Sequence, residues 1–276
     1  MESWHFTVGQ MMSHRSWSWE TDGLRVIPGF LDATRCQQLR TRAAQIVAEQ
    51  RASSPQVVFE TDQQSHAGDE HFASSGGAIR LFFEEADPQQ VNKIGHALHD
   101  LDPAFAELSR QPGLAKIVDE VGIAQPRLVQ SMYIFKAPGV GGAVNVHQDA
   151  SFLRTEPASV VGLWFALHDA DPGNGCLWAL PGRHREPVRS VFGYDAPDGG
   201  LGTTVTDARP WDLDEAVPIG VPMGTLVVLH GRLPHFSRPN RSRRPRDAYA
   251  LHVVDGAATW SEANWLRRAA PFRGFD

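Results

Sequence analysis

The part of the chain that follows residue 126 is a series of short β-forming runs, and this pattern restricts the possible folds more than any other feature. Turn dipeptides separate the runs, among them Asn174-Gly175 and Pro181-Gly182. Short strands at this spacing are typical of antiparallel sheets that form a sandwich or a barrel. Asn174-Gly175 also predicts a hairpin between the second and third runs, because this dipeptide favours tight two-residue turns. The runs are residues 128–135, 160–167, 176–180, 225–230 and 248–254.

The sequence before residue 126 is mostly helical in its periodicity. Residues 24–31 predict a short strand that runs into a turn. Asp32 and Thr34 are candidate N-caps of a helix that continues to about Gln50, because apolar residues follow one face of that segment. Further helical patterns cover residues 91–98 and 103–121, the second interrupted at residues 112–113.

Two segments lack a clear period. Residues 1–23 are rich in Trp, Ser and His, and we expect them to form a loose N-terminal extension. Residues 51–78 are polar and predict a long loop, which in a compact enzyme is often a lid over the active site. Neither a linker nor an internal repeat divides the sequence. We therefore expect one α+β domain over residues 1–276, with N-terminal helices that support a β-sandwich or barrel.

The composition argues against several classes of protein. The 276 residues carry 26 basic and 32 acidic side chains, whereas a nucleic-acid-binding protein normally presents a basic face. No apolar run approaches the roughly 20 residues of a membrane-spanning helix. The two cysteines, Cys36 and Cys176, are too few for a disulfide framework, and the first residues do not resemble a signal peptide. We expect a cytoplasmic protein with no nucleic-acid or membrane partner.

Among the twelve histidines, one stands in a His-x-Asp pattern, formed by His147, Gln148 and Asp149. Residues i and i+2 of an extended chain project to the same face, so the imidazole and the carboxylate can converge on one metal ion. Two histidines and one carboxylate are the ligand set of non-haem iron(II) oxygenases, and the third ligand is expected from a later strand. The candidates for it are His168, His184, His230, His235 and His252.

Taken alone, the His-x-Asp pattern has a second explanation, an exposed loop pair that binds no metal, because so short a pattern recurs by chance. Its surroundings favour the metal site. Gly141 and Gly142 precede the pattern, and Val144 and Val146 alternate into it as they would on a strand.

Nine segments, taken together and in this order, carry a family resemblance. They are VIPGFL (26–31), SSGGAIRLFFE (74–84), NKIGHALHDLDPAF (92–105), VQSMYIFK (129–136), HQDASFLRTEP (147–157), NGCLWALPGRH (174–184), LHGRLPHFSRPN (229–240), RDAYALH (246–252) and TWSEANWL (259–266). The chain resembles the phytanoyl-CoA dioxygenase family of Fe(II)/2-oxoglutarate oxygenases. This resemblance implies a double-stranded β-helix core, a jelly roll of the cupin-like kind, with supporting N-terminal helices. It also implies Fe(II), 2-oxoglutarate and O2 as cofactor and cosubstrates.

The resemblance also selects the site residues. In the family, the distal histidine lies eleven residues before the arginine that pairs with 2-oxoglutarate, a spacing that His235 and Arg246 match. It therefore implies His147, Asp149 and His235 as metal ligands, and Arg246 as the bidentate partner of the far carboxylate. Ser237 would donate a hydrogen bond to the same carboxylate. Further pocket residues implied are Lys93, Met132, Trp164 and Gln148, the last through its backbone.

These residues predict an oxidoreductase that hydroxylates, or otherwise oxidises, a C–H bond of a small organic molecule such as an intermediate of natural-product biosynthesis. Hydroxylation, desaturation, cyclisation and epimerisation stay open as outcomes. One alternative is an acyl-CoA hydroxylase, in which the basic segment 238–244 would bind the CoA phosphates. Another is a metal-binding jelly roll without catalysis, which would have no need of the cosubstrate arginine Arg246.

Overall fold

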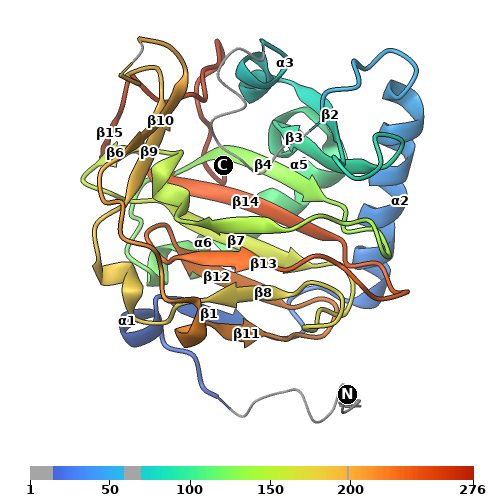
Figure 1. Cartoon of the computed structure of the whole chain (residues 1–276), viewed down its shortest axis with the longest axis horizontal. Coiled ribbons are helices and arrows are strands. Elements are labelled where there is room, and N and C mark those ends of the chain that lie inside the picture. Colours follow the sequence, from blue (N-terminus) through green and yellow to red (C-terminus); the bar gives the residue numbers. More distant parts are fainter. Residues whose placement is uncertain (1–14, 59–69, 198) are drawn as a thin grey trace.

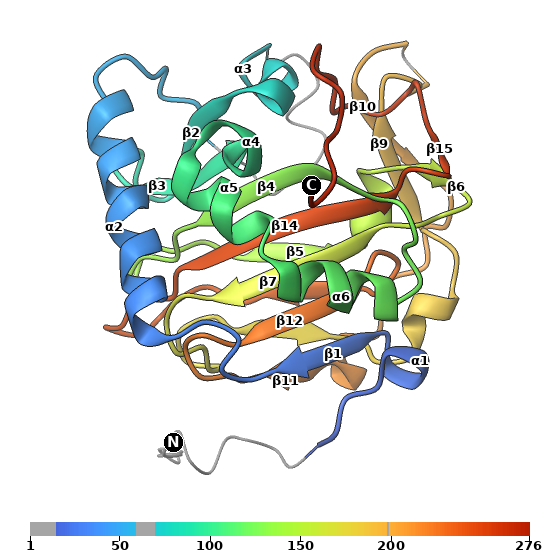
Figure 2. The same cartoon turned by 180° about the vertical axis from the view of Figure 1, so that it is seen from behind.

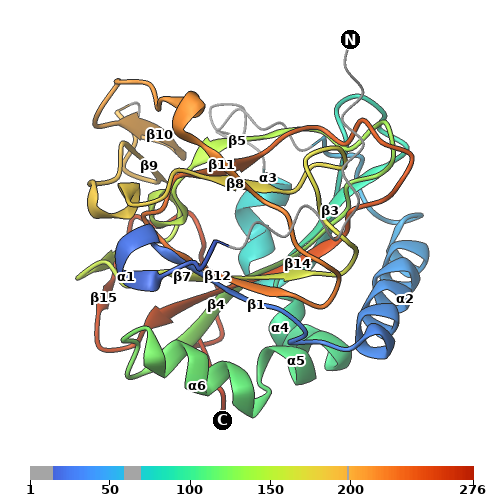
Figure 3. The same cartoon turned by 90° about the horizontal axis from the view of Figure 1, so that it is seen from below.

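Two antiparallel sheets lie face to face in the computed structural model, which describes residues 15–58, 70–197 and 199–276 (Figure 1 and, from below, Figure 3). The larger sheet contains, in spatial order, β1 (Leu24–Ile27), β12 (Leu226–His230), β7 (Val161–Ala166), β14 (Ala248–Asp255), β4 (Pro126–Ile134), β3 (Val91–His96) and β2 (Ile79–Phe83). The smaller sheet contains β11 (Val217–Ile219), β8 (Leu177–Ala179), β13 (His235–Ser237) and β5 (Val144–His147).

Most successive strands from β4 onward alternate between the two sheets. The larger sheet takes β4, β7, β12 and β14, and the smaller sheet takes β5, β8 and β13, with antiparallel pairing throughout. Alternation of this kind is the topology of a jelly roll. It confirms the predicted double-stranded β-helix, and each of the five predicted runs overlaps one of these core strands.

Two short ribbons extend the sandwich at one end (Figure 1). They are β9 (Ser190–Gly193) with β10 (Gly202–Val205), and β6 (Thr155–Glu156) with β15 (Thr259–Trp260). Single 3-10 turns complete the connections at η1 (Ser74–Gly77), η2 (Asp149–Ser151), η3 (Arg183–Arg185) and η4 (Leu213–Glu215).

Helices cover the outer face of the larger sheet (Figure 2). The described helices are α1 (Trp19–Asp22), α2 (Ala33–Gln50), α3 (Glu70–Ala73), α4 (Leu98–Leu101), α5 (Pro103–Ser109) and α6 (Pro112–Glu120). α5 and α6 confirm the interrupted pattern predicted over residues 103–121. For α2, Asp32 is the N-cap, since its carboxylate accepts the backbone N–H of Arg35 at 2.7 Å. Leu39, Ala43 and Ile46 are buried against the sheet.

Strand alternation sends the apolar residues of the larger sheet to its outer or its inner face, and this division places the site. On β14, Tyr249 and Leu251 pack in the outer core under the helices, whereas Ala248 and Ala250 pack in the inner core between the sheets. Because side chains alternate along a strand, His252 also faces the space between the sheets. It is buried there.

The prediction of a helix over residues 91–98 is wrong. Residues 91–96 form β3, which pairs with β2 on one side and β4 on the other. Within this pairing, Gly95 lies opposite Met132 of β4. Pairing with two neighbouring strands satisfies the backbone of this segment, and local periodicity cannot report such long-range partners.

The prediction of a hairpin at Asn174-Gly175 is also wrong, although the turn itself forms. Gly175 has φ +84°, and the Asn174 amide oxygen accepts the backbone N–H of Asp171 at 2.8 Å. The strands on either side, β7 and β8, belong to different sheets and do not pair with each other. The turn therefore carries the chain across the sandwich.

Residues 15–23 are expected to be part of a loose extension, but residues 19–22 form the helix α1. Ser18 caps α1, Gly23 ends it at φ +76°, and the Trp19 ring lies 5.4 Å from the ring of His230. Residues 1–14 lie outside the described part. Of the predicted loop over residues 51–78, the described portion contains α3 and η1, and residues 59–69 are likewise not described, so its role as a lid stays a prediction.

Within the described ranges, no helix is both long and apolar enough to span a membrane. The assignment of residues 1–276 to one domain stays a prediction.

Replacing Leu39 with Ala should lower the free energy of unfolding by about 3 kcal/mol, because the leucine is fully buried and its loss leaves a cavity between α2 and the sheet. Thr34→Ala, on the exposed face of the same helix, should change it by less than about 0.5 kcal/mol. Urea unfolding followed by circular dichroism measures both. Equal effects of the two substitutions would contradict this packing.

Candidate metal centre

Three side chains converge between the sheets. His147 ends β5, Asp149 begins η2, and His235 begins β13, where it pairs directly with His147. Their ligand atoms all lie within 4.8 Å of one another. Oδ1 of Asp149 is 3.6 Å from Nε2 of His147 and 3.7 Å from Nε2 of His235. The structure thus brings together the two residues of the His-x-Asp pattern and one of the five candidates for the third ligand.

Both imidazole rings are oriented by backbone carbonyls. Nδ1 of His147 lies 2.8 Å from the carbonyl oxygen of Asn145, and Nδ1 of His235 lies 3.0 Å from that of Leu233. A carbonyl can only accept, so each Nδ1 carries a hydrogen and each Nε2 faces Asp149. Burial lowers the pKa of His235 to about 4, so this ring is neutral at pH 7 and able to bind a metal.

The carboxylate of Asp149 is ionised although it is buried. Burial by itself would raise its pKa, but the adjoining imidazoles, first of all His252 and His235, hold that pKa well below its ordinary value. Nε2 of His252 lies 3.3 Å from Oδ2, the oxygen that faces away from the two ligand histidines. Gly162 pairs with His252 across β7 and β14, and a Cβ at Gly162 would come within 2.9 Å of Oδ2. The glycine therefore lets the carboxylate lie against the sheet.

The three converging residues line a cavity of about 180 Å³ that also contains Arg246 and Ser237. Nε and Nη1 of Arg246 and Oγ of Ser237 are buried and have no hydrogen-bond partner in the described structure. An unpaired buried donor costs about 1–3 kcal/mol, so these atoms fit a ligand that supplies acceptor oxygens. Burial lowers the pKa of Arg246 to about 10, which leaves the guanidinium charged at pH 7. A carboxylate is the matching group.

Neighbouring backbone and ring contacts hold Arg246 in place. Its backbone N–H donates to the carbonyl of Lys136 at 3.2 Å, and Nδ2 of Asn240 donates to the same oxygen at 2.8 Å. Nζ of Lys136 in turn donates to the carbonyl of Gly142 at 2.6 Å. The guanidinium carbon lies 5.6 Å from the centre of the Trp164 ring.

Three more of the predicted pocket residues line the cavity: Lys93 on β3, Met132 on β4 and Trp164 on β7. Lys93 is buried, and burial lowers its pKa to about 7 against the opposing effect of the Glu84 carboxylate. Its charge therefore changes close to neutral pH.

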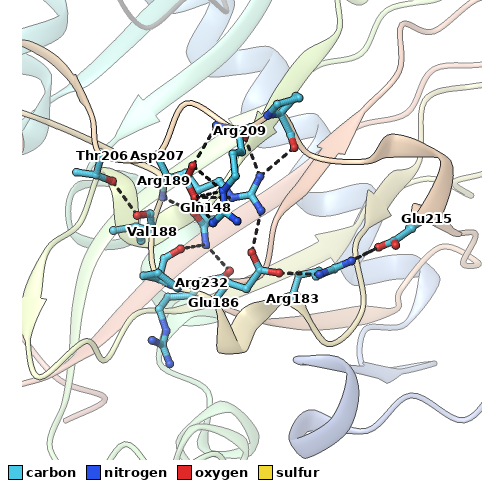
Figure 4. Close-up of polar contacts among 12 residues, drawn as sticks. Gln148, Arg183, Glu186, Val188, Arg189, Thr206, Asp207, Arg209, Glu215 and Arg232 are labelled. Atoms are coloured by element: carbon cyan, nitrogen blue, oxygen red, sulfur yellow. Dashed lines mark hydrogen bonds and ion pairs between the residues drawn. The ribbon is translucent and has the colours of Figure 1, made fainter.

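Gln148 does not line the cavity, and its side chain points to the opposite side, as predicted. Nε2 donates to the carbonyl of Arg232 at 2.8 Å, and Oε1 accepts the backbone N–H of Arg189 at 3.0 Å (Figure 4). Arg189 also pairs with Glu186 at 2.8 Å. The amide thus anchors the segment between the two ligand residues. A cosubstrate contact through the Gln148 backbone stays a prediction.

The other candidates for the third ligand lie elsewhere. His184 and His230 contact each other, with ring centres 5.1 Å apart, and Nδ1 of His168 accepts the backbone N–H of Asp247. His252 is close to the site but contacts the far oxygen of Asp149. The alternation of the predicted strand 248–254 could have placed it on the inner face.

Sequence reasoning missed the aromatic part of the cavity. Its lining residues belong to α3, β3, the segment after η2, β9 and the segment after β15, so no local pattern connects them. They are Phe72, His96, Phe152, Phe192 and Trp265.

Comparison with known proteins agrees with this geometry. The family model of phytanoyl-CoA dioxygenase (PhyH) matches residues 19–248. The phytanoyl-CoA dioxygenase domain-containing protein 1 of Rattus norvegicus is 39% identical, over 90% of this chain and 92% of that protein. Phytanoyl-CoA dioxygenase 1 of Oryza sativa subsp. japonica is 37% identical, over 96% of each chain.

Solved structures share the fold at lower sequence identity. The epimerase SnoN, in complex with Fe3+, alpha ketoglutarate and nogalamycin RO, has a TM-score of 0.65 at 18% identity, over 93% of this chain and 91% of that one. EctD from S. alaskensis, with 2-oxoglutarate and 5-hydroxyectoine, has a TM-score of 0.64 at 17% identity, over 93% and 82%. The family model and the curated relatives extend over most of the sequence, and the chain therefore belongs to the phytanoyl-CoA dioxygenase (PhyH) family of Fe(II)/2-oxoglutarate-dependent oxygenases.

Proposed function

We propose that this chain binds Fe(II) and 2-oxoglutarate and oxidises a C–H bond of a small organic molecule. The observation that carries the proposal is the convergence of His147, Asp149 and His235 in one cavity with the unpaired, buried guanidinium nitrogens of Arg246. A metal-binding module without catalysis would have no need of that buried cation. A cosubstrate dicarboxylate does need it, because burying a carboxylate without a charged partner is unfavourable.

The residues of the site have distinct tasks in this proposal. The two histidine Nε2 atoms and the Asp149 carboxylate would hold Fe(II) on one face and leave positions open on the other. Iron bound there would supply the oxidising chemistry, in which O2 is consumed and 2-oxoglutarate loses CO2 to become succinate. Arg246 and Ser237 would bind the far carboxylate of 2-oxoglutarate, and Lys93 would add positive charge. Trp164 and Met132 would exclude water from this end of the cavity, where low polarity strengthens the ion pair.

The contacts of the basic segment 238–244 favour a small molecule over an acyl-CoA. Arg244 forms an ion pair with Asp171, and the guanidinium of Arg238 lies 4.3 Å from the centre of the Trp178 ring. Two of the cations that CoA phosphates would require are therefore already engaged by side chains of the protein itself.

Replacing His147 or Asp149 with Ala should abolish iron-dependent turnover of 2-oxoglutarate, because two remaining ligands hold the metal weakly. The charge-transfer band that Fe(II) and 2-oxoglutarate produce together under anaerobic conditions should also disappear, and absorption spectroscopy measures it. Asp119→Ala removes an exposed carboxylate from α6 and should leave both properties intact. An undiminished band in either ligand variant would refute the assignment.

Arg246→Lys should raise the Kd for 2-oxoglutarate by about 10- to 100-fold, because an ammonium cannot bind a carboxylate through two parallel hydrogen bonds. The Kd for Fe(II) should stay unchanged. Arg243→Lys is the matched control, since Arg243 is exposed, and it should alter neither constant. Titration of 2-oxoglutarate into the iron-loaded protein gives the values, and equal effects of the two substitutions would contradict the role of Arg246.

The binding of 2-oxoglutarate should depend on the protonation of Lys93. The pKa of this lysine in the free protein is about 7, and a bound carboxylate would favour the charged amine. Binding should therefore take up a proton, and the affinity should fall as the pH rises from about 6 to about 8.5.

Anaerobic calorimetry in buffers of different ionisation enthalpy measures that proton uptake. Lys93→Met should remove both the uptake and the fall in affinity, whereas Lys116→Met, at an exposed position of α6, should keep both. Native protein that takes up no proton on binding would show that Lys93 does not approach the cosubstrate.

A further inference from the structure

The cavity has a second end that the proposed cosubstrate does not use. Arg246 precedes β14, His252 lies beside Asp149 farther along this strand, and Val254 follows on the same face. At about 3.3 Å per residue, the extended chain spans about 26 Å between residues 246 and 254. Val254 belongs to a separate apolar cluster that contains the aromatic residues of the cavity. The converging ligand residues therefore lie between a cationic end and an aromatic end.

The aromatic end is a continuous set of ring contacts. Phe72 and Trp265 are stacked with ring centres 4.4 Å apart, and Phe192 meets Phe72 edge to face at 6.0 Å. Phe152 bridges this group to the site, with its ring centre 5.9 Å from Phe192 and 6.0 Å from His147. A molecule held against these rings would lie next to the proposed metal.

The lysine and arginine side chains of the cavity lie at the other end. Lys93 pairs with Ile134 on β4, and Ile134 pairs with Ala248 on β14. Ala248 is two residues from Arg246, so Lys93 lies at the same end of the sheet as Arg246. Lys136 is joined to Arg246 through its backbone. Within the described ranges, the cavity lining at the aromatic end includes no Asp, Glu, Lys or Arg side chain. A charged ligand group would be buried there without a partner, which is strongly unfavourable.

One polar atom at the aromatic end has no partner. Trp265 is 1% exposed, and its Nε1–H donates to no acceptor in the described structure. A buried tryptophan N–H normally finds an acceptor, and leaving it unpaired costs about 1–3 kcal/mol. Trp265 lines the cavity, so a ligand there whose acceptor oxygen reaches this N–H would recover the free energy.

We propose that the aromatic end binds the substrate, and that the substrate is a compact, uncharged and largely apolar molecule. It has a flat face for the ring wall and one hydrogen-bond acceptor for the N–H of Trp265. The inference rests on the proposed function, because the cosubstrate occupies the cationic end. The whole cavity of about 180 Å³ is smaller than the roughly 300 Å³ from which drug-sized pockets begin, which argues against a long acyl chain.

Three small probes with one phenyl ring separate the parts of this proposal: acetophenone offers a neutral acceptor, ethylbenzene lacks it, and benzoate carries a charge. Each is titrated calorimetrically into protein loaded anaerobically with Fe(II) and 2-oxoglutarate. Acetophenone should bind about fivefold more tightly than ethylbenzene, as one hydrogen bond implies, and at least tenfold more tightly than benzoate. Palmitoyl-CoA should bind more weakly than acetophenone.

Two tryptophan variants test the hydrogen bond itself. Trp265→Phe keeps a ring in the wall and removes the N–H, so it should weaken acetophenone about fivefold and leave ethylbenzene unchanged. Trp178→Phe is the matched control, because the Nε1 of Trp178 is also buried without a partner but does not line the cavity. It should change neither affinity.

The proposal is overturned if benzoate or palmitoyl-CoA binds more tightly than acetophenone, if no probe binds, or if Trp265→Phe leaves acetophenone unchanged or weakens both neutral probes equally. The charge-transfer band, recorded before any probe is added, separates this failure from that of the proposed function. A protein without the band fails the proposed function, and one with the band that fails the probe test loses only the substrate inference.

Discussion

The pairing of β13 with β5 is the interaction on which the site depends. It sets His235 opposite His147, while the extended backbone at Gln148 turns Asp149 toward both rings. The hydrogen bonds of the Gln148 amide, made on the other side of the strand, fix that backbone. A slip of one residue in this register would move one imidazole to the opposite face and separate the three ligand atoms. The jelly roll is thus the means by which residues 88 positions apart in the sequence share one point.

Charge balance explains why so many ionisable groups can lie together in one buried cavity. Asp149 is the anion at the centre, where burial keeps His235 neutral, and the Arg246 cation lies toward one end. Lys93 stands against Glu84, and its pKa near 7 lets it gain or lose a proton as its surroundings change. A divalent metal and a dicarboxylate added to this set compensate each other and leave the Asp149 and Arg246 charges in balance. Both ligands together therefore fit the cavity better than either alone.

The local signals of the sequence located most core strands, the long helix α2 and the His-x-Asp pattern, because alternation, capping and spacing are short-range properties. The family resemblance supplied the choice of His235 and the double-stranded β-helix. Long-range pairing decided what remained. Residues 91–96 became a strand because two neighbours satisfy their backbone, and Asn174-Gly175 became a crossing between sheets because its flanking strands found other partners. The aromatic end lay beyond prediction, since Phe72 and Trp265 are distant in sequence and stack only in the folded chain.

The two ends of the cavity have different origins in the fold. His147, His235 and Lys93 lie on strands of the two sheets, and Arg246 lies just before β14, where backbone pairing restricts movement. Most residues of the aromatic end instead come from α3, the β9–β10 ribbon and the segments after η2 and β15, elements outside the alternating strands, and His96 comes from β3 (Figure 1). Changes in those peripheral elements can reshape substrate binding without disturbing the ligand register. A fold divided in this way can keep one arrangement of ligand residues while the residues around it vary.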